Sequence, residues 1–158
     1  MELEDLEEAL RSLSSQGHVL SCEELCGLKA GLMLLKANEK GKAIQFWGKI
    51  LGKDSDYYIA FAIAASPDMY PAKCFYYAGE DFNFAALPEL TEEVGEAVQA
   101  LQLTSPLTGK PSAMLDTVEG AESQAKLTEL DRLALLVQEI DFDTAAVPKG
   151  AHCLTEAQ

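Results

Sequence analysis

The sequence predicts an α+β fold in which two N-terminal helices precede an antiparallel four-stranded meander and further helices follow the sheet. Three observations support this prediction. Apolar residues recur at helical spacing before residue 40 and after residue 128. Between these regions lie short segments rich in apolar, β-branched and aromatic residues, as in strands. Residues 46–60 place a polar, turn-forming run between two such segments, which is typical of a β-hairpin.

The first 40 residues are predicted to form two helices. One stripe of the first helix carries four leucines: Leu3, Leu6, Leu10 and Leu13. The second helix should begin after Ser21, which forms a capping box with Glu24, and should end by Gly41. It should bury Leu25, Leu28, Leu32 and Leu35. These stripes admit two interpretations: packing on the chain's own sheet, or a surface for partner helices. Residues 1–20 are therefore a candidate partner-binding terminal helix.

Strands are predicted at about residues 43–52, 56–64, 73–78 and 81–85, with Gly79 and Glu80 as a tight turn. Strict alternation in the first strand places Phe46, Gly48, Ile50 and Gly52 on one face and Trp47, Lys49 and Leu51 on the other. Both faces then carry bulky apolar side chains. We expect helices to cover one face and a second cover, which in a small chain could be another protein, to lie on the other.

The remaining chain is predicted to contain two helices separated by a loop. A helix should start at Thr91, where Glu92 and Glu93 suit the positive end of the helix dipole, and run to about Gln102. Residues 104–124 are rich in Pro, Gly and small polar residues and should form a long surface loop. The last helix, at about 128–140, has one apolar stripe: Leu130, Leu133, Val137 and Ile140. Residues 1–158 are expected to form one domain.

Composition restricts the classes of partner. The 158 residues carry a formal net charge of −14, which would repel nucleic-acid backbones and anionic lipid headgroups. No apolar run approaches the roughly 20 residues of a membrane-spanning helix, and the acidic N-terminus is unlike a targeting peptide. We therefore expect no nucleic-acid or membrane partner and an intracellular location, where four cysteines should be free thiols: Cys22, Cys26, Cys74 and Cys153.

Candidates for chemistry all have simpler explanations. Residues 48–53 are one residue short of a phosphate-binding loop, and the segment is predicted to be a strand. His18, Cys22 and Cys26, with His152 and Cys153, lack the Cys-x-x-Cys pair of a typical zinc site. Four acids could meet at one end of the meander as an acid/base pair, but turns normally collect solvated acids: Asp54, Asp56, Glu80 and Asp81. We assign no catalytic, cofactor or metal site. A small-molecule-binding or acid/base catalytic domain remains the alternative, and convergent polar groups in a pocket would favour it.

The hairpin resembles a known family. Phe-Trp-Gly-Lys-Ile-Leu-Gly at 46–52, a short loop, and Asp-Tyr-Tyr-Ile at 56–59 match, nearly letter for letter, a string found in the radial spoke head proteins of the ciliary axoneme. The resemblance extends in the family's order through residues 32–36, 74–77, 87–88 and 127–151. The short N-terminus and the Leu-Met-Leu-Leu-Lys segment before the hairpin distinguish this chain from the family's paralogues 4 and 6. The family's C-terminal half is missing here, so functions located there cannot be carried over.

The resemblance implies a non-catalytic subunit that scaffolds contact between the spoke head and the central-pair apparatus, for control of ciliary and flagellar motility. It implies an axonemal location and, as partners, other spoke head subunits such as paralogues 4 and 6 or a second copy. Central-pair projections would be reached indirectly. Together with the two-sided sheet, it makes seven apolar residues candidates for a protein interface: Trp47, Ile50, Leu51, Tyr57, Tyr58, Phe75 and Tyr76.

Overall fold

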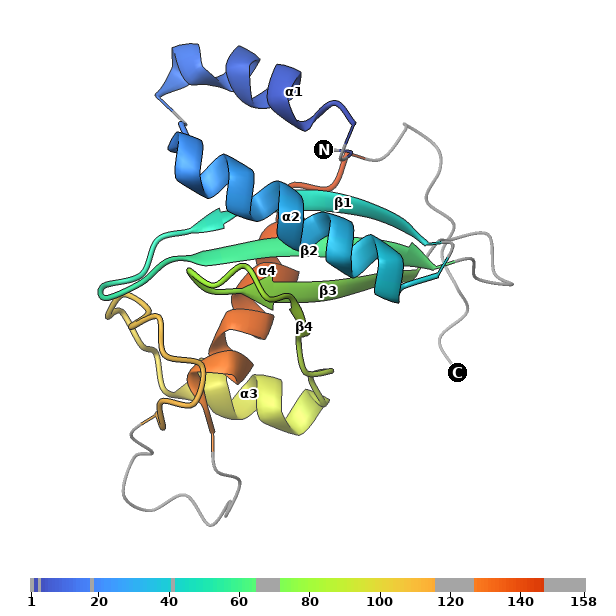
Figure 1. Cartoon of the computed structure of the whole chain (residues 1–158). Coiled ribbons are helices and arrows are strands. Elements are labelled where there is room, and N and C mark those ends of the chain that lie inside the picture. The colour runs from blue at the N-terminus through green and yellow to red at the C-terminus, as the bar shows by residue number, and fades with distance from the viewer. Residues whose placement is uncertain are drawn as a thin grey trace.

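An antiparallel sheet of four strands forms the centre of the fold, and helices lie against both of its faces (Figure 1). The computed structural model describes residues 2, 4–17, 19–40, 42–64, 72–115 and 127–146. The strands follow one another in space in the order of the chain: β1 (Ala43–Ile50), β2 (Tyr57–Ala64), β3 (Ala72–Ala78) and β4 (Ala85–Ala86). The predicted α+β class and the meander are confirmed.

The helices lie close to their predicted positions. They are α1 (Leu6–Leu13), continued by the short 3-10 helix η1 (Ser14–Gln16), α2 (Cys22–Asn38), α3 (Glu92–Ala100) and α4 (Glu129–Asp143). The capping box that starts α2 is present: the Glu24 backbone N–H donates to Ser21 Oγ at 3.1 Å, and the Ser21 N–H donates to Glu24 Oε2 at 2.6 Å. Leu3 and Gly41, which were part of the helix predictions, lie outside the described residues.

Each face of the sheet carries its own apolar core. On one face α2 packs its buried leucines against the even-numbered positions of β2, while Leu6 of α1 is fully buried in the same cluster. On the other face Leu133 and Val137 of α4 pack against Tyr57 and Ile59. In Figure 1, α2 crosses in front of the sheet and α4 behind it. The second cover, which we allowed could be another protein, is therefore a helix of the same chain.

A β-bulge at Trp47 changes the face assignment in β1. The register with β2 shifts between Phe46 and Gly48, so Trp47 is the extra residue. Phe46 packs in the α2-side core, whereas Trp47 and Ile50 both pack against the α4-side core. The strict alternation that placed Ile50 with Phe46 is therefore wrong, because the inserted residue reverses the orientation of every later side chain in the strand.

The fourth strand differs from its prediction. Residues 81–85 do not form a strand after a turn at 79–80; only β4 pairs, with Ala86 opposite Tyr76 and Ala85 opposite Tyr77. Phe82 instead adopts a left-handed backbone conformation, with φ of 53°. Its ring lies 4.8 Å from that of Tyr58.

Two glycines of α2 provide the flat surface that receives Phe82. A Cβ atom at Gly27 would lie 2.4 Å from the Phe82 ring, and one at Gly31 would lie 2.3 Å from the Phe82 carbonyl oxygen. The loop before β4 therefore packs the partly buried Phe82 ring against Tyr58 and α2 instead of extending the strand, which removes apolar surface from water.

We expect Gly31→Ala to destabilise the fold by about 1 to 3 kcal/mol, because the new methyl group would collide with the backbone of Phe82. Urea denaturation measures the effect. Gly95→Ala in α3 is the matched control: its Cβ would meet only Leu135 Cδ1, at 4.0 Å, so higher helix propensity should stabilise the fold by about 0.5 to 1 kcal/mol. Equal effects of the two substitutions would contradict the proposed packing.

Candidate protein interface

The seven predicted interface residues occupy different environments. Tyr57, Tyr58 and Tyr76 are buried within the chain, at 0%, 3% and 6% exposure. Trp47, Ile50 and Phe75 are partly buried against the α4-side core. Leu51, at the end of the hairpin strand, is 72% exposed. The structure therefore does not bring the seven together on one accessible surface, because the chain's own helices cover most of them.

Trp47 is held at the end of α4 by a polar contact. Its indole Nε1–H donates to Asp141 Oδ1 at 3.2 Å, and Lys73 Nζ of β3 donates to both oxygens of the same carboxylate at 2.9 and 2.7 Å. The Lys73 ammonium also lies 5.3 Å from the centre of the Phe61 ring. Asp141 thus connects α4 to both β1 and β3, and the only tryptophan has a structural function in this chain.

Glu129, at the start of α4, is a buried charged side chain, with 2% exposure. Tyr57 OH donates to its Oε1 at 2.7 Å, and the backbone N–H groups of Gly109 and Lys110 donate to the same oxygen at 2.8 and 3.1 Å. Thr108 donates to Oε2 from its N–H at 2.8 Å and from its Oγ1 at 2.6 Å. One carboxylate therefore joins β2, α4 and the loop at 107–110.

These hydrogen bonds favour the ionised form of Glu129. Burial by itself would raise the pKa of its carboxyl group, but hydrogen bonds from Thr108, Tyr57 and Gly109 outweigh burial and lower the pKa below its ordinary value. Burial and the bond to Glu129 raise the pKa of Tyr57 well above its usual range. Because both carboxylate oxygens are occupied by donors from the chain, this cluster is built to hold the loop rather than to exchange protons with a ligand.

The loop predicted at 104–124 is therefore anchored in its first part. Leu107 is buried, and its carbonyl accepts from the Lys53 N–H at 2.7 Å. Gly109 has φ of 90°, and a Cβ atom there would lie 2.3 Å from Ser55 O, so this position requires glycine. Residues 116–126 lie outside the described part of the chain.

A second polar cluster connects α2 to the hairpin. Lys49 Nζ contacts Glu24 Oε1 at 2.6 Å and Asp56 Oδ2 at 2.8 Å, and Tyr58 OH donates to Glu24 Oε1 at 2.6 Å. Hydrogen bonds from Lys49 and Tyr58 lower the pKa of Glu24 from 4.5 to about 2. Burial would lower the pKa of Lys49, but Asp56 and Glu24 raise it above its ordinary value. The bulge makes this cluster possible, because it turns Lys49 toward α2.

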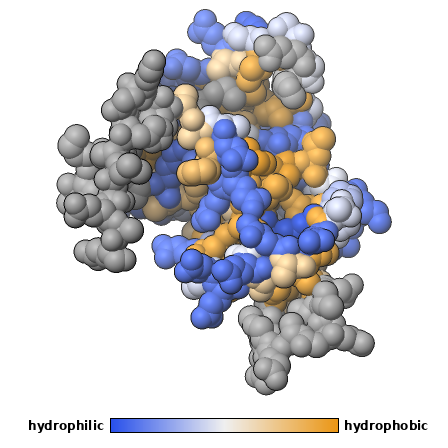
Figure 2. All heavy atoms as spheres, turned by 180° about the vertical axis from the view of Figure 1, so that it is seen from behind, coloured by the Kyte–Doolittle hydropathy of each residue, from blue (hydrophilic) through white to orange (hydrophobic). Residues whose placement is uncertain are grey.

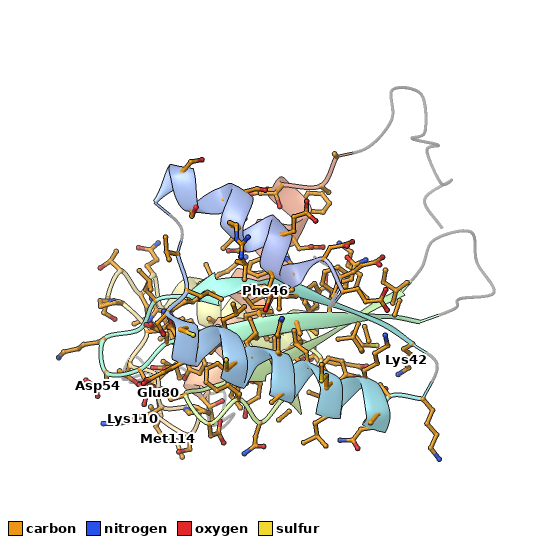
Figure 3. All side chains as sticks on the ribbon, turned by 45° about the horizontal axis from the view of Figure 1, so that its top comes forward. Lys42, Phe46, Asp54, Glu80, Lys110 and Met114 are labelled. Atoms are coloured by element: carbon orange, nitrogen blue, oxygen red, sulfur yellow. The ribbon has the colours of Figure 1, made fainter. Side chains whose placement is uncertain are left out.

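Three of the four acids proposed as an acid/base group have separate partners, whereas Glu80 is an exposed turn residue. Asp54 pairs with Lys110 at 3.0 Å, Asp56 with Lys49, and Asp81 accepts from the side chain of Asn83 at 3.0 Å. Figure 3 shows Asp54, Glu80 and Lys110 at one end of the molecule and Lys42 at the other. The acids therefore gather at the turns without forming a paired carboxylate site.

A hollow between α3 and α4 is mostly apolar. Val98, Leu103, Leu135 and Leu136 contribute to its lining. The guanidinium of Arg132 at its edge already donates to the carbonyl oxygens of Leu103 and Ser105, at 3.0 and 2.5 Å. Seen from behind, the molecule shows apolar surface interspersed with hydrophilic side chains (Figure 2). Gln99, Gln102, Thr104 and Glu139 also line this hollow, and Gln99 Nε2 already donates to Glu139 Oε1 at 2.9 Å.

The described residues show no group of three or more His, Cys, Asp or Glu side chains that could hold a metal ion. His18, His152 and Cys153 lie outside the described part of the chain, whereas Cys22, Cys26 and Cys74 are exposed free thiols. No described helix is long and apolar enough to cross a membrane.

Comparisons with known proteins agree with the resemblance inferred from the hairpin. A family model described as radial spokehead-like protein matches residues 1–112. Proteins named radial spoke head protein 9 homolog are similar over 96% of this chain, with 33% identity for Danio rerio, 29% for Mus musculus and 28% for Homo sapiens. The chain spans 57% of the length of each of these relatives.

Replacing Glu129 by Gln should cost at least about 3 kcal/mol of unfolding free energy, because an amide nitrogen would face buried N–H and O–H donors. Tyr57→Phe, which removes one donor and leaves the others in place, should cost about 1.5 kcal/mol. Chemical denaturation of both variants tests this ranking. A loss for Glu129→Gln below about 0.5 kcal/mol would show that the carboxylate does not anchor the loop.

Acid should destabilise the fold through Glu24. Because its folded pKa of about 2 lies below the ordinary value of 4.5, its contribution is complete above pH 4.5 and is lost as the pH falls toward 2. The urea midpoint should therefore decrease over this range, and Glu24→Gln should make the decrease smaller. Glu23→Gln, at the neighbouring exposed position, is the control. Parallel pH profiles for the wild type and Glu24→Gln would contradict the assignment.

Proposed function

The chain belongs to the radial spokehead-like protein family, and on this premise we propose that it is a non-catalytic structural subunit of the radial spoke head. The observation that carries the proposal is its similarity, over 96% of its length, to proteins named radial spoke head protein 9 homolog. We place it in the axoneme of cilia and flagella, after assembly from the cytoplasm. Its task would be to scaffold the contact with the central-pair apparatus that controls motility.

The contacts of three carboxylates support a structural function. Glu129, Asp141 and Glu24 each connect segments that are distant in the sequence, and their carboxylates bind donors of the chain itself. Such contacts keep two layers of helices fixed on one sheet. A part that transmits force needs this rigidity, whereas a catalytic site needs groups that remain available to a substrate.

We propose the spoke head paralogues 4 and 6, or a second copy, as direct partners, with central-pair projections contacted indirectly. Of the predicted interface residues, Leu51 is the most exposed, at 72%. Trp47, Ile50 and Phe75 lie partly buried in the core behind the hairpin and would support its position. The three buried tyrosines would not touch a partner and would affect the contact only by stabilising the fold: Tyr57, Tyr58 and Tyr76. The hairpin end at Leu51 is thus our proposed contact.

Tagged protein in a ciliated cell should remain with the axoneme after detergent extraction, and cryo-tomography should locate the tag at the spoke head. An unrelated cytosolic protein carrying the same tag is the control for extraction. Recovery of the chain only in the soluble fraction would refute the proposed location.

Co-expression tests the partners. The chain should elute with paralogue 4 or 6 in size-exclusion chromatography with light scattering, and the complex should persist at high salt because apolar burial is insensitive to screening. Leu51→Glu should weaken co-elution at least about tenfold. Met114→Glu, at another exposed apolar position, should not. A chain that stays monomeric with every spoke head subunit would contradict the scaffold function.

A further inference from the structure

Helix α2 carries apolar side chains on the face that points away from the sheet. Met33 and Leu34 are 57% and 55% exposed, although both lie in the middle of a helix whose other side is buried. Six of the exposed residues on this face are apolar or small, and we call them the outer stripe: Cys22, Cys26, Ala30, Met33, Leu34 and Ala37. The exposed Glu23 lies on the same face, in line with Ala30.

The spacing of the outer stripe makes it one continuous surface. Successive members lie three or four residues apart, apart from the adjacent pair Met33 and Leu34, so they follow one side of the helix. The opposite side buries Leu28, Leu32 and Leu35 in the core. The outer stripe is thus an apolar patch of the kind that marks a protein contact.

The side chains of the outer stripe suit another helix. The N-terminal half has the small residues Cys22, Cys26 and Ala30, which allow a second backbone to approach closely. The C-terminal half has Met33 and Leu34, whose longer side chains can insert between the residues of a facing helix. This change from small to long side chains along the stripe favours a partner helix that lies along α2.

Charge along one edge of the outer stripe indicates what that helix carries. Lys29 forms an ion pair with Glu7, and Lys36 lies 4.0 Å from Glu4, so the N-terminal segment runs beside this edge of α2. Four exposed carboxylates lie in this segment: Glu4, Asp5, Glu7 and Glu8. Glu4 and Glu7 pair with Lys36 and Lys29, and Asp5 and Glu8 add further negative charge. The chain as a whole is also strongly acidic, at −14. Basic residues on an incoming helix would be attracted to this edge.

We propose that the outer stripe of α2 binds an amphipathic α-helix of another protein, with its apolar face on the stripe and lysine or arginine residues beside the acidic N-terminal segment. The inference deepens the proposed function by naming the surface and the chemistry of one partner. Its site lies on the opposite side of the sheet from the core that holds Trp47 and Ile50.

Two labelled synthetic helices of about five turns provide the probe. Both carry the same Leu/Ala face, and their flanks carry lysine in one peptide and glutamate in the other. Fluorescence anisotropy with the full chain should show at least about tenfold tighter binding of the lysine peptide. The double substitution Met33→Glu/Leu34→Glu should weaken that binding at least about tenfold, although it makes the protein more acidic. Phe142→Glu, at a residue with 82% exposure on α4, should leave it unchanged.

The sign of the double-variant effect separates docking from general attraction between opposite charges. Unchanged or tighter binding of the lysine peptide to the Glu variant would overturn the proposal, as would equal binding of both peptides to the wild type. A wild-type dimer that the double variant converts to a monomer, without peptide binding, would assign the stripe to a second copy and would also overturn it.

Melting curves should show that both variants fold, and Ala30→Gln provides a milder second variant that should also weaken binding. Because these measurements use purified chain, they can fail while retention in the axoneme and co-elution with paralogues still succeed. Failure of the inference and failure of the proposed function are therefore distinguishable.

Discussion

The fold depends on one constraint: its central sheet is apolar on both faces, and each face must be removed from water. Tyr58, Ala60 and Ala62 of β2 are buried on one side, and Tyr57 and Ile59 on the other. Because adjacent residues of one strand contribute to different cores, neither layer of helices can be lost without exposing half of the strand. The sheet thus makes α2 and α4 mutually necessary.

The second face is covered by α4, which follows the sheet after a long stretch of sequence, and two carboxylates of α4 fix its position. Glu129 accepts hydrogen bonds from Tyr57 and from the loop at 108–110, while Asp141 binds Trp47 and Lys73. Because Glu129 is 2% exposed, leaving its carboxylate without donors would be costly, which favours the position of α4 in which these donors are met. They specify the arrangement, whereas the apolar cores supply most of the driving force.

The bulge at Trp47 decides which hairpin side chains are available for a protein contact. By reversing the side chains after Phe46, it moves Ile50 into the α4-side core and turns Lys49 toward Glu24 and Tyr58. The hairpin whose sequence most clearly identifies the family therefore contacts both helix layers, α2 on one face of the sheet and α4 on the other. Among the described residues, exposed apolar side chains remain at the hairpin end, where Leu51 is 72% exposed, and on the outer stripe of α2, where Met33 and Leu34 are 57% and 55% exposed.

The sequence by itself determined the elements and the family. The capping box at Ser21, the leucine spacing of α2 and α4, and the hairpin string are local signals, which depend on residues within a few positions of one another. Only the tertiary structure decided which face each hairpin residue occupies, that Phe82 packs on Gly27 and Gly31 instead of extending a strand, and that Glu129 anchors a loop about 20 residues before it. These outcomes follow from contacts between distant segments, where burial and hydrogen bonding outweigh local propensity, and no periodicity in the chain encodes them.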